Sequence, residues 1–238
     1  MSQPEDSLFR RHRRVFLLTL LLPIALIASA DFVLDPFAAY RVVPLPQLHG
    51  YRKEMDSRVA RAELLEHGAC GVAIVGTSRA QIAIDPEHPA WGRPACNLAL
   101  TGAAIGEIEG VVRSVLRHAD VHELFWALDF TSFDTRADPH PEFLRSRFNA
   151  RLDRFEYHAG LLLGGNALRA SWRLLRDYRG GRLSPYGELG LTDPSLEIHE
   201  REYRERFLWS LGRDVGALGR PERFAYDADA TRDVAALA

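Results

Sequence analysis

The sequence predicts an α/β protein with a parallel sheet of about three strands, surrounding helices, a helical C-terminal half and one N-terminal transmembrane helix. Three observations carry this prediction. A basic N-terminus precedes a long uncharged apolar run, three short apolar segments then alternate with helical patterns, and the chain beyond residue 130 is rich in Arg and Leu at helical spacing. Strands that alternate with helices form parallel sheets with right-handed crossovers.

The overall composition limits the class of protein. The 238 residues include 30 basic and 32 acidic side chains, and 47% of them are hydrophobic. This balance indicates a packed domain and excludes wholesale disorder. A pI near 6.5 implies no strongly basic face, so nucleic acid is not an expected partner. His118 and His122 have i,i+4 spacing but cross a helix-to-strand boundary, so we expect surface or core residues rather than metal ligands. Asp129, Asp134 and Asp138 near His140 could form a divalent site, but acidic loops are usually only solvated, and we expect no metal and no cofactor.

The N-terminal region has the pattern of a membrane-targeting segment. Residues 1–14 hold four arginines and two acidic residues, and the next charge after them is Asp31. Because basic flanks stay in the cytoplasm, we expect a cytoplasmic tail over 1–14 and a transmembrane signal-anchor over 15–34. The alternatives are a cleaved signal ending at Ala28-Ser29-Ala30 and a buried core helix. With either an anchor or a signal, the rest of the chain lies outside the cytoplasm.

The elements after the anchor follow in a regular order. Residues 35–52 contain three prolines and no periodicity, which predicts an extended connector to a domain over 53–238. Short apolar runs without polar alternation are typical of strands buried on both faces, and they occur at 71–76, 97–100 and 122–128. Apolar residues at helical spacing predict helices at 53–67, 79–84, 103–118, 142–178 with a break near Gly164, and 195–211.

Three polar or glycine-containing turns follow the three predicted strands. Ligands of open α/β sheets bind at the carboxyl ends of the strands, where Ser78, Gly102 and Asp129 stand. A serine at a strand-to-helix turn exposes its hydroxyl, and its N–H at the helix N-terminus can stabilise an oxyanion. Gly102 can offer a second N–H. The alternative is that Ser78 only caps the helix at Arg79 and Gly102 only permits a tight turn.

The block Gly76-Thr77-Ser78-Arg79, followed about twenty residues later by Asn97-Leu98-Ala99-Leu100-Thr101-Gly102, resembles the SGNH (GDSL-like) hydrolase superfamily. The similarity covers roughly residues 72–134 and is greatest to bacterial membrane-anchored members with a G-[ST]-S-R block. It implies a partial flavodoxin-like sheet, with Ser78 as nucleophile and the N–H groups of Ser78 and Gly102 as oxyanion hole. Further residues expected to line the site are Arg79, Asn97 and Asp129.

The resemblance also implies a function and a location. The chemistry would be acyl-ester hydrolysis or O-acyl transfer on a cell-envelope component such as a polysaccharide. The protein would cross the bacterial inner membrane once, with its bulk in the periplasm or at the cell exterior, and its partners would be the membrane and envelope polysaccharide or its assembly proteins. The alternative function is that of a non-catalytic envelope binding or assembly protein.

Two departures from the family pattern lead to a further expectation. Asp129 stands where the family usually has Asn, and the last 40 residues contain His199 but no Asp-x-x-His box. Only three strands are clear, whereas sheets of this type have about five. We therefore expect an incomplete hydrolase, whether a truncated product, a fragment or a half completed by a partner.

Cys70 and Cys96 each precede a predicted strand by one or two residues. Outside the cytoplasm such a pair can form a disulfide. The alternative is two small buried thiols, because neighbouring parallel strands seldom offer disulfide geometry.

Overall fold

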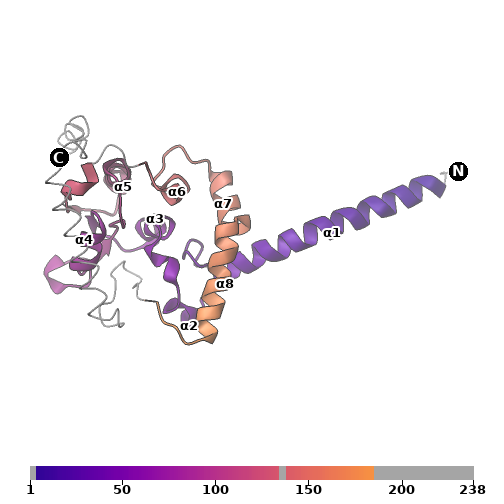
Figure 1. The fold of residues 1–238 in the computed structure, drawn as a ribbon, viewed down its shortest axis with the longest axis horizontal. Helices are drawn as coiled ribbons and strands as arrows, with labels where there is room; N and C mark the ends of the chain where they lie inside the picture. The colour runs from indigo at the N-terminus through magenta and orange to yellow at the C-terminus, as the bar shows by residue number, and fades with distance from the viewer. Residues whose placement is uncertain (1–3, 134–137, 185–238) are drawn as a thin grey trace, which may run out of the picture.

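The computed structural model describes residues 4–133 and 138–184 (Figure 1). The predicted helix at 195–211 and His199 lie outside this range. Eight α-helices are described: α1 (Pro4–Leu34), α2 (Pro46–His49), α3 (Arg58–His67), α4 (Ser78–Ala83), α5 (Ile105–Arg117), α6 (Pro141–Leu144), α7 (Arg154–Leu163) and α8 (Gly165–Arg179). The strands are β1 (Val72–Val75), β2 (Ala95–Asn97) and β3 (Glu123–Trp126), and the 3₁₀ turns are η1 (Lys53–Asp56), η2 (Pro89–Trp91) and η3 (Phe130–Phe133).

The three strands form a parallel sheet in the order β2-β1-β3, which confirms the mixed α/β class. The central strand β1 is buried along its whole length, as its uninterrupted apolar sequence predicts. The second strand begins two residues earlier than expected, at Ala95. A further parallel bridge between Thr77 and Leu100 extends the pairing past the end of β1.

Helices cover one face of the sheet and a loop segment covers the other. Ala73 and Val75 of β1 pack with apolar residues of α3 and α5, because alternate side chains of a strand point to the same face. Val72 and Ile74 point to the opposite face and pack against Ile84 and Trp91.

Cys70 and Cys96 are joined in a disulfide, with their Cα atoms 5.3 Å apart. The bond connects the residue before Gly71 to the middle of β2, and both cysteines are buried. Of the two alternatives that the sequence leaves open, the structure contains the bridged one.

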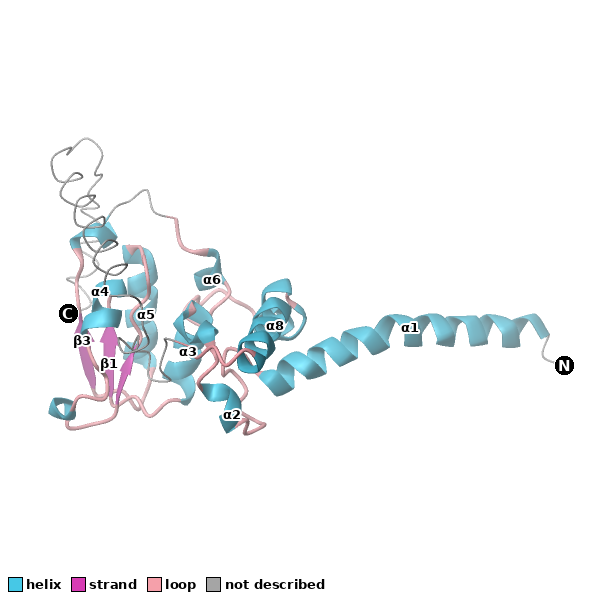
Figure 2. Cartoon of the chain, turned by 60° about the horizontal axis from the view of Figure 1, so that its bottom comes forward, coloured by secondary structure: helices cyan, strands magenta, loops and turns pink. Residues whose placement is uncertain are grey.

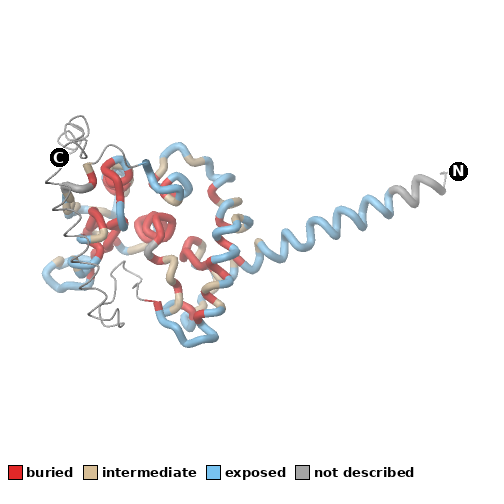
Figure 3. The backbone as a smooth tube through the Cα atoms, in the orientation of Figure 1, coloured by how far each residue is buried: buried red, intermediate tan, exposed pale blue. Residues whose placement is uncertain are grey.

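Helix α1 projects away from the rest of the molecule (Figures 1 and 3). Its segment Arg10–Leu34 is 25 residues long and contains an 18-residue window with a mean hydropathy of 2.3, so it is long and apolar enough to cross a membrane. The side chains from Val15 to Ile27 are exposed, so this segment is not a buried core helix. Only its last turns pack on the domain, where Asp31 is buried beside Ser171 of α8.

The segment after α1 is compact, which corrects the prediction of an extended connector over 35–52. The Asp35 carboxylate accepts hydrogen bonds from the backbone N–H groups of Ala39 (2.7 Å), Tyr40 (3.1 Å) and Arg41 (2.8 Å). Asp35, Ala38 and Arg41 have φ of 45°, 54° and 50°, a conformation that L-residues rarely adopt. The carboxylate compensates this strain, and the short helix α2 follows.

The described helices of the C-terminal half include α7 and α8, which form a layer near α3. Helices α7 and α8, separated at Gly164 as predicted, lie across the end of the body from which α1 projects (Figures 1 and 2). The buried carboxylate of Glu63 on α3 accepts hydrogen bonds from Tyr157 of α7 and from Arg147 (2.6 Å). Burial, followed by the charge of Glu63, raises the pKa of Tyr157 above its ordinary value, so the phenol stays a donor.

Candidate functional site

The turn that follows β1 presents Ser78 at the start of a helix. A Cβ on Gly76 would lie 2.8 Å from the Ala80 Cβ and 2.9 Å from the Ala127 carbonyl oxygen, so only glycine allows this close turn. Thr77 is the N-cap of α4, and its hydroxyl accepts from the Arg79 N–H at 3.4 Å. The residue that caps the helix is therefore Thr77, and half-buried Ser78 is the first helical residue.

The turn that follows β2 lies beside the Ser78 turn. The bridge between Thr77 and Leu100 brings the two turns to the same edge of the sheet. Gly102 has φ +62°, and a Cβ built there meets nothing within 4 Å, so its backbone faces open space. Two hydrogen bonds hold the preceding residue, Thr101. Its carbonyl accepts from Arg58 (3.0 Å), and its hydroxyl donates to Gln81 (2.7 Å).

Asp129 follows the third strand, and its side chain binds Thr77 and Arg79 in the turn after the first strand. Its carboxylate accepts from the Thr77 hydroxyl at 2.9 Å and pairs with Arg79 at 2.5 Å. Asp129 is mostly covered, whereas Arg79 is largely exposed. The guanidinium therefore balances the negative charge that Asp129 brings to this edge, and we call the three residues the Thr77–Arg79–Asp129 clamp.

Asn97 lies beneath the edge rather than along it. Its side chain is fully buried, and its amide donates to the Ala80 (3.1 Å) and Ile84 (3.0 Å) carbonyls at the end of α4. Its side-chain oxygen accepts from the Ala99 N–H at 3.1 Å. Of the five predicted site residues, Ser78, Arg79, Gly102 and Asp129 come together at the edge. Asn97 instead holds the helix that carries Ser78.

A group that activates Ser78 is not found in the described part of the chain. Within residues 4–133 and 138–184, the Ser78 hydroxyl makes no hydrogen bond to a base. The same residues hold no cluster of three or more His, Cys, Asp or Glu side chains suited to a metal ion. The edge as described can therefore orient a serine and offer N–H groups, and a base would have to come from elsewhere.

The sequence interpretation missed the supports of this edge. Gln81 and the buried pair of Arg58 with Glu107 hold the Gly102 turn, although nothing in their spacing relates them to it. Glu107 did carry one signal, because a Glu near the start of a helix often accepts from the N-cap backbone. Here it accepts from the Ala104 N–H at 3.2 Å.

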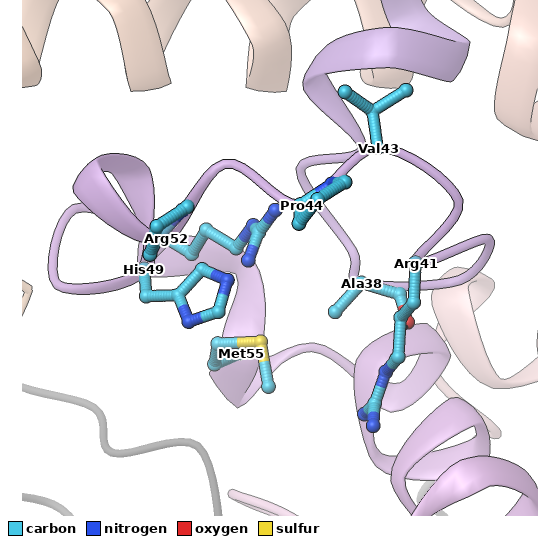
Figure 4. Close-up of a pocket in the computed structure, with 8 residues that line it drawn as sticks. Ala38, Arg41, Val43, Pro44, His49, Arg52 and Met55 are labelled. Atoms are coloured by element: carbon cyan, nitrogen blue, oxygen red, sulfur yellow. Dashed lines mark hydrogen bonds between the residues drawn. The ribbon is translucent and has the colours of Figure 1, made fainter.

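A second site candidate is a cavity of about 260 Å³ formed by the chain segment 38–55, which includes α2 and part of η1 (Figure 4). In Figure 4, His49, Arg52 and Met55 lie on one side of the cavity and Ala38 lies on the other. No acidic residue lines this cavity, so it favours anions. The lining residues are Ala38, Arg41, Val43, Pro44, Pro46, His49, Arg52 and Met55.

Comparisons with protein families, curated proteins and solved structures returned no match for this chain.

Proposed function

We propose that the chain is a single-pass, extracytoplasmic SGNH-like protein whose Ser78 edge hydrolyses or transfers acyl esters of a cell-envelope component. The observation that carries the proposal is the Thr77–Leu100 bridge, which sets the Ser78 and Gly102 turns side by side. An acyl-transfer site needs a nucleophile and two N–H donors near one carbonyl carbon, and neighbouring turns can supply both.

The strand order gives further support. The order β2-β1-β3 matches the first three strands of the flavodoxin-like order 2-1-3-4-5. Its switch point lies between β1 and β3, which is where Ser78 and Asp129 stand. Pairing of Asp129 with Arg79 reduces the repulsion that a free carboxylate would exert on a developing oxyanion.

The catalytic step would run through the serine oxygen. Ser78 Oγ attacks the ester carbonyl, its proton passes to a general base, and the alcohol leaves with a proton to give an acyl-enzyme. Water or a second alcohol then accepts the acyl group. The general base would come from outside the described residues. His199 is the first candidate in this chain, and a residue of a partner chain is the alternative.

Labelling with a fluorophosphonate tests the nucleophile. Full-length protein in its native membranes should be labelled, and Ser78→Ala should lose the label, whereas the control Ser114→Ala on α5 should keep it. Label that persists in Ser78→Ala refutes the assignment. Absence of label from wild type as well refutes the catalytic proposal and favours the second function below.

The orientation is part of the proposal and has its own test. Because four arginines precede the apolar segment, the N-terminus should stay in the cytoplasm. An alkaline phosphatase fused after the last residue should be active and sediment with membranes. An intact but inactive fusion contradicts this orientation, and an active fusion found in the soluble fraction indicates a cleaved signal.

The second candidate function is non-catalytic binding of an envelope polymer, and the basic cavity favours it. Arg41, His49 and Arg52 form its polar lining, which suits carboxylate or phosphate groups. Arg41→Gln should weaken binding of a uronic-acid polysaccharide several-fold, whereas Arg93→Gln, an exposed control, should not. Equal binding by both variants speaks against this function.

A further inference from the structure

Helices α7 and α8 carry large apolar side chains on their outer surface. The most exposed are Phe155 at 81% and Trp172 at 64%, and Leu163 and Leu168 are exposed as well. We call these four residues the outer apolar face. The buried side chains of α8, which include Ala167, Ala170 and Leu174, point to the opposite side, into the domain.

The outer apolar face borders the membrane helix. On α8, Ser171 lies beside Asp31 of α1, and Leu168 lies three residues before Ser171, on the adjoining side of the helix. Trp172 follows Leu168 by four residues and so shares its side. On α7, the His158 ring stacks on Tyr40, and Tyr40 in turn contacts Phe32 of α1.

Phe155 precedes His158 by three residues and so lies on the same side of α7. Figures 1 and 2 show both helices crossing the end of the body from which α1 projects. The helices that carry these apolar side chains thus lie next to the point where α1 leaves the domain.

The length of α1 brings the domain down to the bilayer. Between the basic tail and buried Asp31, the uncharged segment 15–30 has 16 residues. At 1.5 Å per residue it spans about 24 Å, whereas the hydrocarbon core of a bilayer is about 30 Å thick. Because Asp31 is already packed on the domain, the domain surface next to it lies close to the outer membrane interface.

The charge of α7 and α8 identifies the occupant of this face. Together the two helices carry five arginines and two acidic residues, and Arg154, Arg169 and Arg179 are exposed. A second copy docked on the same face would set arginine against arginine. Lipid phosphates are complementary to them, and exposed Trp and Phe are typical of the interfacial belt.

From these observations we infer that the outer apolar face of α7 and α8 rests in the headgroup region of the membrane that α1 crosses, so that the domain lies on the outer leaflet. Phe155 and Trp172 enter the interface, and the arginines bind lipid phosphates. This inference rests on the proposed anchor, and its test separates the two.

Fluorescence quenching by brominated lipids tests the contact. Full-length protein is placed in nanodiscs of phosphatidylcholine and phosphatidylglycerol whose acyl chains carry bromine near the headgroup. We expect quenching in the wild type, loss of at least about half of the quenched emission in Trp172→Phe, and little change in Trp91→Phe, whose ring packs at the sheet. Equal quenching in wild type and Trp172→Phe refutes the contact.

Two controls keep the result interpretable. Protein that does not co-purify with the discs refutes the anchor itself, whereas protein that co-purifies without Trp172 quenching refutes only the contact. Discs with one copy and with two copies should quench equally. If Trp172 is quenched in discs with one copy but much less in discs with two, the outer apolar face joins two copies instead of contacting lipid. That result overturns the inference. The melting temperature of Trp172→Phe should match that of wild type.

Discussion

Replacement of Glu107 by Gln should destabilise the domain strongly, because it removes one charge from a buried pair. Arg58 Nε lies 2.9 Å from Glu107 Oε1, and a second bond of 3.2 Å joins the guanidinium to Oε2. Side-chain exposure is 7% for Arg58 and 1% for Glu107, so water cannot replace the lost partner. Glutamine keeps the volume of the side chain, and no cavity is formed. Leaving one charge of a buried pair without its partner costs about 3–5 kcal/mol.

Thermal unfolding of the purified full-length chain in detergent measures this loss. For a protein of this size about 2–4 °C corresponds to 1 kcal/mol, so the melting temperature should fall by about 6–20 °C. The matched control is Glu109→Gln on the same helix, whose carboxylate pairs with exposed Arg113 and should contribute less than about 1 kcal/mol.

Equal melting temperatures for Glu107→Gln and Glu109→Gln would falsify the argument from burial. The pair also carries a consequence for the site, because Arg58 holds the Thr101 carbonyl before Gly102. Fluorophosphonate labelling of Ser78 should therefore fall in Glu107→Gln at temperatures where the domain is still folded.

Two further predictions concern the disulfide and one buried carboxylate. The Cys70–Cys96 bond closes a loop with a sequence separation of 26, so the double variant Cys70→Ser/Cys96→Ser should lose about 3–4 kcal/mol in denaturant unfolding without reductant, and thiol titration of the wild type should find no free thiol in the unfolded protein. Burial acts to raise the pKa of Asp177, but Lys53 and Arg176 outweigh it and hold that pKa below its ordinary 3.8. The stability that this carboxylate contributes should be fully present above about pH 4 and disappear as the pH falls through the lower folded pKa, so the difference between wild type and Asp177→Asn should shrink only in strong acid. A difference that already shrinks near neutral pH would contradict this assignment.

Periodicity predicted the positions of the strands and the longer helices. The burial predicted for the third strand was wrong in the described structure, because Glu123 and Phe125 of β3 are exposed and its other two residues are only partly buried. The run at 71–76 is apolar on both faces and forms central β1, and the helix expected at 103–118 is α5. The prediction of an extended connector over 35–52 was wrong for a physical reason. Its structure depends on one carboxylate and on left-handed backbone at Ala38 and Arg41, which leave no trace in composition or spacing.

The candidate site was predictable only where it depends on the ends of strands. Ser78 comes shortly after β1, and Gly102 comes shortly after the bridge at Leu100 that continues the β1–β2 pairing, so their meeting at one edge follows from parallel topology. The clamp of Thr77 and Arg79 with Asp129 joins residues about 50 positions apart. Asn97, at the end of β2, supports α4. Such contacts depend on side-chain positions in three dimensions, and a single sequence does not encode them as a local pattern.

The compact junction at Asp35 also determines what the Ser78 edge can reach. Figures 1 and 2 place the sheet and α4 at the end of the body opposite α1. Because residues 35–41 fold around one carboxylate, the body has no long tether on which to swing toward the bilayer. The Ser78 edge is therefore held at a constant distance from the point where α1 leaves the domain, and this distance is about the thickness of the domain. With α1 in the membrane as proposed, this position suits a polymer that extends away from the bilayer rather than a lipid within it.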